Sequence, residues 1–208
     1  MTLLERPILE TYPGHSSLVL ETKRLALRAP RLKDAKTVAM LANDRRIAEN
    51  TARIPHPYTV SDAEGFLALA NTSGGETAFI ITLRDGPVIG ACSLTDGQAP
   101  ELGYWLGVKH WGKGYATEAV HALIDYAFTD LEHDCLQAGA RVTNPASRRV
   151  LEKCGFQWTG VGLYRIRALA SSAPIDRFRL DRGIWRSLKN WSCARRPSWR
   201  ARCLPAAR

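Results

Sequence analysis

Apolar side chains recur at spacings of three and four along residues 115–131, as expected of a helix with one buried face. The buried face would hold Ala116, Ala119, Val120, Leu123, Ile124, Ala127 and Phe128. Glu118, His121 and Asp125 fall between these positions, so their side chains are expected to point largely outward. The segment therefore predicts a long amphipathic helix packed on the core.

The remaining chain alternates between strand-like and helix-like patterns. Strands are predicted at 24–29, 77–84, 87–94, 101–107, 135–142, 157–168 and 176–182, and further helices at 32–43, 62–71 and 145–154. Asp85 and Gly86 favour positive φ and predict a tight hairpin. Ser61 and Glu64 predict a capping box at the second helix. This order indicates a single-domain α/β fold, with a mixed central sheet flanked by helices on both faces.

The most informative segment runs from Glu101 to Ala119 and reads ELGYWLGVKHWGKGYATEA. An apolar strand passes through a Gly/Lys-rich turn directly into the 115–131 helix. Gly112 and Gly114 let the backbone pass close to a ligand, and the helix start offers N–H groups and a positive dipole end to a phosphate. Three interpretations compete: a nucleotide P-loop, a coenzyme A site and an ordinary strand–turn–helix junction. The P-loop pattern fails because Gly114 stands where Ser or Thr must bind Mg²⁺.

A second motif, NPASRRVLEKCGF, covers residues 144–156 and has the caps of a complete helix. About 30 residues separate it from the first motif. Together the two motifs resemble the GCN5-related N-acetyltransferases (GNAT), whose R/Q-x-x-G-x-G/A signature aligns with residues 111–116. Trp111 replaces the usual Arg or Gln. The whole first motif is similar to the branch that contains bacterial ribosomal-protein N-terminal acetyltransferases, in which an aromatic residue at this position is ordinary.

The resemblance implies acetyl-CoA as co-substrate, with backbone N–H groups of the turn around the pyrophosphate and the charge of Lys113 nearby. It also implies that the pantetheine arm pairs with backbone groups at the end of the 101–107 strand and contacts the amide of Asn144. The residues implied in cofactor binding are Leu106, Gly107, Val108, Trp111, Gly112, Lys113, Gly114, Tyr115, Ala116, Thr117 and Asn144.

Acetyl transfer requires a neutral amine, so a carboxylate that removes its proton would assist catalysis. Glu101 is the preferred general base, because family members often carry an acidic residue at the head of this strand. Glu118 is a rival carboxylate that a role at the helix dipole explains better. Ser147 or Tyr104 could protonate the departing thiolate, although a hydroxyl in the first turn of a helix also satisfies the backbone.

The resemblance implies direct attack of a primary amine within a ternary complex. The acceptor stays open between a protein N-terminus, a polyamine, an amino acid and an amine antibiotic, because residues 45–60 carry no readable code. Two alternatives are transfer of a different acyl group and a catalytically inactive module that binds CoA or RNA.

The net charge of +9 is unevenly distributed, because seven basic residues and no acids lie in residues 186–208, which leaves +2 for residues 1–185. We therefore predict an N-terminal extension at 1–20, a GNAT domain at 21–185 and a basic, disordered tail at 186–208. Nucleic acid could bind only through that tail.

Five scattered cysteines without C-x-x-C spacing fit a reducing compartment, and the five histidines form no metal-ligand pattern. No apolar run approaches the roughly 20 residues of a membrane span. The sequence thus predicts a cytoplasmic protein, without a metal or a membrane contact, that is a monomer or a homodimer.

Overall fold

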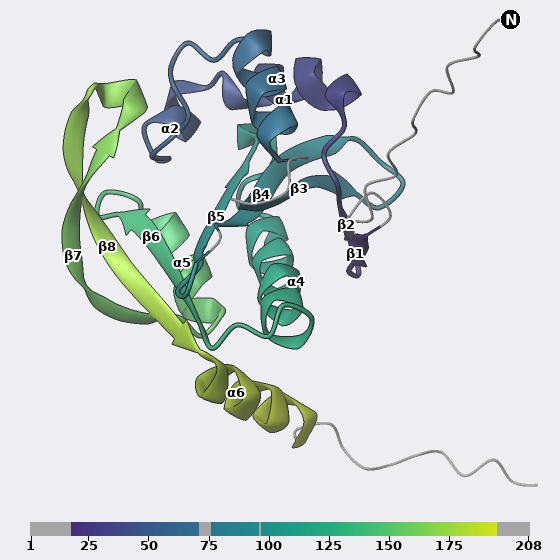
Figure 1. The fold of residues 1–208 in the computed structure, drawn as a ribbon, viewed down its shortest axis with the longest axis vertical. Coiled ribbons are helices and arrows are strands. Elements are labelled where there is room, and N and C mark those ends of the chain that lie inside the picture. The colour runs from purple at the N-terminus through teal and green to yellow at the C-terminus, as the bar shows by residue number, and fades with distance from the viewer. Residues whose placement is uncertain (1–17, 71–75, 96, 195–208) are drawn as a thin grey trace, which may run out of the picture.

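The computed structural model describes residues 18–70, 76–95 and 97–194 (Figure 1). The strands are β1 (Val19–Glu21), β2 (Leu25–Arg28), β3 (Glu76–Leu83), β4 (Val88–Thr95), β5 (Glu101–Leu106), β6 (Cys135–Arg141), β7 (Gln157–Ile166) and β8 (Ser171–Asp181). The α-helices are α1 (Ala35–Ala42), α2 (Arg45–Ala48), α3 (Val60–Leu69), α4 (Tyr115–Thr129), α5 (Pro145–Lys153) and α6 (Arg182–Ala194). Short 3₁₀ turns η1 (Leu32–Asp34), η2 (Val108–His110) and η3 (Arg167–Leu169) connect them.

The eight strands form one mixed sheet in the order β1-β2-β3-β4-β5-β6-β8-β7. Neighbouring strands are antiparallel except for β5 and β6, which are parallel. The parallel pair is short, since only Glu101 and Leu102 have partners on β6, at Gln137 and Ala138. Beyond Leu102 the two strands separate, and β5 keeps its register with β4 alone as far as Leu106.

Side chains on each strand alternate between two cores, as the period of a strand requires. On β5, Leu102 and Leu106 belong to the larger core under α4 and α5. Trp105 packs on the opposite face against the smaller core of α1 and α3. Helices therefore flank both faces of a mixed sheet (Figure 1), and the predicted α/β architecture is confirmed.

Several predicted boundaries shift in the structure. The capping box of α3 is formed by Thr59 and Asp62, whose side chains bond each other's backbone N–H, so Ser61 is not the cap. The predicted 32–43 helix divides into η1 and α1. In the β3–β4 hairpin it is Asp85 that takes positive φ, at 54°. The predicted N-terminal extension at 1–20 overlaps β1, which pairs with β2, and residues 1–17 lie outside the described residues.

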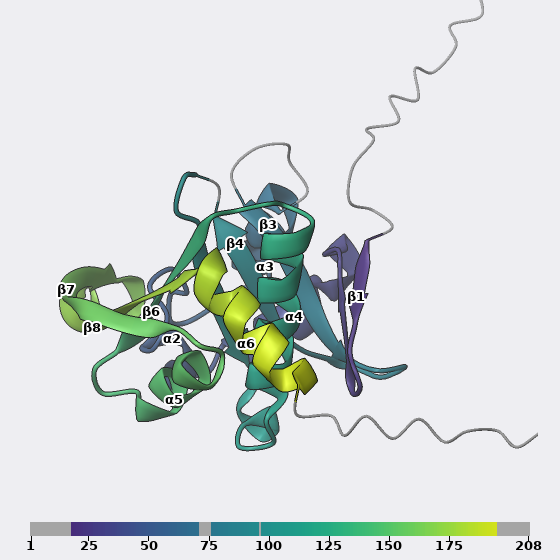
Figure 2. The ribbon, with the colours of Figure 1, turned by 90° about the horizontal axis from the view of Figure 1, so that it is seen from below.

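The predicted tail boundary is wrong for residues 186–194, because α6 continues through them. Figure 2 shows α6 crossing in front of α4. The Trp185 ring lies 5.3 Å from that of Phe128, its Nε1 donates to Asp125 Oδ1 at 2.9 Å, and Lys189 also pairs with Asp125. Ile184 and Trp185 thus pack the start of α6 on the core, and the helix continues through the basic segment. Residues 195–208 lie outside the described part of the chain.

Candidate active site

The turn between β5 and α4 has the backbone geometry expected of an anion site. Gly112 and Gly114 have φ of 72° and 77°, values that side chains disfavour. Gly114 is the N-cap of α4, and the first hydrogen bond of the helix runs from Glu118 N to Gly114 O at 3.1 Å. The N–H groups of the first turn therefore have no acceptor within the helix and point out of its N-terminus.

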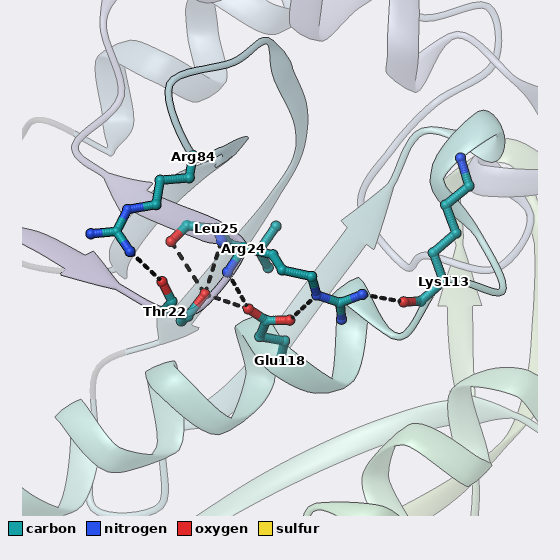
Figure 3. Close-up of polar contacts among 6 residues, drawn as sticks. All are labelled: Thr22, Arg24, Leu25, Arg84, Lys113 and Glu118. Atoms are coloured by element: carbon teal, nitrogen blue, oxygen red, sulfur yellow. Dashed lines mark hydrogen bonds and ion pairs between the residues drawn. The ribbon is translucent and has the colours of Figure 1, made fainter.

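Glu118 joins this turn to the start of β2 through three hydrogen bonds (Figure 3). Its Oε1 accepts from the Thr22 hydroxyl at 2.7 Å and from Arg24 N at 2.8 Å, and its Oε2 accepts from Arg24 Nε at 2.6 Å. The Arg24 guanidinium also donates to the Lys113 carbonyl at 2.9 Å and lies 4.6 Å from the centroid of the Tyr115 ring. We call Thr22, Arg24 and Glu118 the turn clamp, because they hold the glycine turn from outside.

The electrostatics of the clamp favour an ionised Glu118. Burial raises the pKa of this carboxyl, but the hydrogen bonds from Thr22 and Arg24 and the charge of Arg24 outweigh that effect, so its pKa lies below its usual value. The expectation that Glu118 points largely outward is corrected, since only 17% of its side chain is exposed. The sequence did not indicate that Thr22 and Arg24 contact Glu118, because they lie more than 90 residues from it along the chain.

The separated end of β5 lies directly before this turn, and some of its backbone groups already have partners. The Leu106 carbonyl accepts from the Trp111 indole at 2.7 Å, and Gly107 N donates to Ile89 O at 2.8 Å. The carbonyls of Gly107 and Val108 accept from the N–H groups of His110 and Trp111 within η2. Trp111 therefore braces the strand end, and the open edge of β5 toward β6 begins after Leu102.

The two predicted hydroxyl donors meet beside that open edge. Tyr104 on β5 and Ser147 on α5 lie 2.8 Å apart, hydroxyl to hydroxyl. Asn144 caps α5 as predicted, its Oδ1 accepting from Ser147 N at 3.1 Å. Burial raises the pKa of Tyr104 to about 12, with a smaller opposing effect from the Ser147 hydrogen bond. Both hydroxyls are thus held as neutral groups that can donate a proton.

Glu101 lies on the other face of the same strand, two residues before Gly103, and its side chain is exposed. Its Oε1 reaches over β6, where a Cβ on Gly139 would lie 3.7 Å away. Nearby, Arg53 pairs with both carboxylate oxygens of Glu76 at 2.6 Å. The carboxylate and the hydroxyl pair therefore approach the gap between β5 and β6 from opposite faces of the sheet.

Across residues 18–70, 76–95 and 97–194 there is no group of three or more acidic, His or Cys side chains placed to hold a metal ion. In the same part of the chain, no helix is both long and apolar enough to cross a membrane. Cys92, Cys135 and Cys154 are buried free thiols. Cys154 Sγ donates to the carbonyl of Thr117, in the first turn of α4, at 3.8 Å.

Residues 24–157 match the model of a known family, described as an acetyltransferase (GNAT) domain, over more than half of the chain. The chain belongs to the GNAT acetyltransferase family. The match begins at Arg24 of the clamp and ends at the first residue of β7. It therefore includes the turn, Glu101, Tyr104 and Ser147, whereas β8 and α6 lie beyond it.

Individual relatives support this assignment. The uncharacterized N-acetyltransferase p20 of Bacillus licheniformis is 34% identical over 151 residues, covering 68% of this chain and 84% of p20. The ribosomal-protein-S5-alanine acetyltransferase of Vibrio fischeri superposes with a TM-score of 0.69 at 20% identity, covering 81% of this chain and 99% of that one. The spermidine N-acetyltransferase of Vibrio cholerae, solved with CoA and spermine, gives 0.68 at 22% identity, covering 79% and 99%.

The relatives confirm the predicted resemblance to GNAT enzymes, including the ribosomal-protein acetyltransferases. The prediction of an N-acetyltransferase is confirmed at the level of the family. The structural neighbours share the fold and differ in their named acceptors, a ribosomal protein in one and a polyamine in the other. The acceptor of this chain is therefore a separate question.

Proposed function

We propose that the protein transfers the acetyl group of acetyl-CoA to a primary amine by direct attack in a ternary complex. The observation that carries the proposal is the gap between β5 and β6, which has the glycine turn at its end and candidate catalytic groups on both faces. A relative of the same fold, the Microcin C7 self-immunity acetyltransferase MccE, was solved with acetyl-CoA and AMP. That complex supports acetyl-CoA as the donor.

The first-turn amides of α4, together with Gly112, Lys113 and Gly114, bind the pyrophosphate in this proposal. Backbone N–H groups and the helix dipole favour an anion there, and Lys113 adds a positive charge. The pantetheine arm lies along the open edge of β5, where it pairs as an added strand would. Trp111 keeps the strand end in place, and Asn144 presents Ser147 to the thioester.

Starting from the ammonium, the reaction removes two protons from the acceptor nitrogen and delivers one to the leaving group. Glu101, directly or through water, takes the proton from the ammonium, and the free amine attacks the thioester carbonyl carbon. The carbon–sulfur bond of the resulting tetrahedral intermediate then breaks. The departing thiolate takes its proton from the Tyr104–Ser147 pair, whose hydroxyls are neutral at physiological pH. The second proton leaves the nitrogen as the amide forms and returns to this pair through water, so that only the proton taken by Glu101 is released.

A CoA-release assay with acetyl-CoA and a panel of amines tests the activity, and isothermal titration of acetyl-CoA tests the site. Gly114→Trp should abolish binding, because a large side chain at this positive-φ position occupies the space that the phosphate needs. Gly65→Ala, an exposed change within α3 with no atom near the added methyl group, is the matched control. A folded Gly114→Trp protein with wild-type affinity would refute the proposed site.

A further inference from the structure

The face of the sheet that carries Glu101 continues onto β6, β8 and β7. Gly139, in the middle of β6, is exposed on this face, so α1 and α3 do not cover it. Loop contacts close one side, since Arg167 N on η3 donates to Ala52 O at 3.1 Å. Figure 1 shows the β7–β8 hairpin standing beside α2 across this surface.

Arg177 on β8 is exposed on this surface, and contacts with β7 fix the position of its guanidinium. Its guanidinium lies flat over Gly162 on β7, where a Cβ would be only 2.3 Å from Nη2 and 2.6 Å from Cζ. The ring centroid of Tyr164 is 5.5 Å from the guanidinium carbon. The absence of a side chain at Gly162 and the neighbouring Tyr164 ring thus let the Arg177 guanidinium lie against the sheet.

Among the described residues Arg177 has no carboxylate within ion-pair distance, whereas nine of the described arginines do. Its neighbour on the same face, Arg179, pairs with Asp181 at 2.7 Å. Arg141, on the same face of β6, donates through Nη1 to the Glu49 carbonyl, but its buried Nε lacks a partner in the described structure. The Arg177 guanidinium, which is exposed, held in place and without an ion-pair partner among the described residues, is suited to a carboxylate from outside.

The distance between this cation and the proposed general base constrains the ligand. The Glu101 carboxylate lies over β6 and the Arg177 guanidinium over β7, with β8 between them. Two strand spacings across the sheet and an offset of two residues along it separate them, roughly 12 Å. Two residues of an extended peptide, at about 3.3 Å each, together with the length of an acidic side chain cover this distance. An amine beside Glu101 would therefore place the second or third side chain of the same peptide beside Arg177.

We propose that this surface binds the acceptor, and that the acceptor is a peptide or protein N-terminus with an acidic side chain at its second or third residue. The inference rests on the proposed acetyl transfer and adds the class of substrate. A free α-amino acid is too short to reach both groups, and a polyamine has no group that complements Arg177.

The test compares short peptides that differ only in having glutamate, glutamine or lysine at the second or third position, with spermidine and a free amino acid as further acceptors. The wild-type protein should acetylate a glutamate peptide with kcat/KM about tenfold or more above its glutamine counterpart. Arg177→Gln should reduce this preference to within about twofold, and Arg177→Glu should favour lysine instead. Arg165→Gln, on the outer face of the same hairpin, should leave the preference unchanged.

Equal rates for glutamate and glutamine peptides, or an unchanged preference in Arg177→Glu, would overturn the inference alone. Faster turnover of spermidine or the amino acid than of every peptide would also overturn it. If the protein binds acetyl-CoA but acetylates no peptide, the acceptor class is wrong and the cofactor site stands. Failure to bind acetyl-CoA at the glycine turn would instead remove the proposed function itself.

Discussion

Substitution of Glu118 tests whether the turn clamp holds the cofactor turn in place. Glu118→Gln keeps an oxygen that can accept from the Thr22 hydroxyl and Arg24 N, but it loses the ion pair with Arg24 Nε. Glu118→Ala removes all three interactions and takes the acceptor from Arg24 N, while the Thr22 hydroxyl keeps the Leu25 carbonyl at 3.2 Å. The pair of variants therefore separates the charge from the hydrogen bonds.

The expected magnitudes follow from the exposure of the two partners. The Arg24 side chain is 43% exposed, so the ion pair that Glu118→Gln removes is worth about 1 kcal/mol of unfolding free energy. Glu118 itself is mostly buried, and losing three hydrogen bonds in Glu118→Ala should cost about 2–4 kcal/mol. In acetyl-CoA binding we expect Glu118→Ala to weaken affinity by about tenfold, which corresponds to about 1.4 kcal/mol.

Urea unfolding and isothermal titration of acetyl-CoA measure the two effects. Arg84→Gln is the matched control, because its pair with Glu21 is more than half exposed on both sides and should contribute almost nothing. The pKa of Glu118 is lowered in the folded state, so its contribution is present above its ordinary pKa of 4.5 and is lost as pH falls through the folded value. The stability gap between wild type and Glu118→Gln should accordingly narrow in acid. Equal stability and affinity for wild type and Glu118→Ala at pH 7 would refute the clamp.

Three further outcomes are expected. Glu101→Gln should lower kcat by at least about tenfold at neutral pH, with a deficit that shrinks as pH rises, whereas wild-type turnover at pH 7 would move the role to water or another residue. Tyr104→Phe should lower kcat while changing the KM for acetyl-CoA little. Because the pKa of Tyr104 is about 12, deprotonation of this group should cause no loss of wild-type activity up to about pH 10. Truncation after Asp181, which removes α6, should destabilise the protein in thermal unfolding, while truncation after Ala194 should not; equal melting temperatures would show that Trp185 packing contributes little.

The sequence determined the elements whose signals are local. The three- and four-residue spacing of α4 and the Asn144 cap of α5 depend on neighbours within a turn or two, and both are found as predicted. The glycine turn could also be predicted from the sequence, because glycine adopts positive φ readily and Gly112 and Gly114 both do so. The family assignment followed from the same two local motifs.

Tertiary structure decided the interactions that join distant segments. Glu118 looked outward on a helical pattern, yet it is mostly buried because Thr22 and Arg24 reach it from β2. The basic 186–194 segment looked like a tail, yet it continues helix α6, and its Lys189 pairs with Asp125 on α4. Arg177 is aligned with Gly162 only because β7 and β8 pair in one particular register. Periodicity along the chain encodes which face of an element is apolar, but the partner of each face depends on sheet order and register, and these are set by packing across the whole fold.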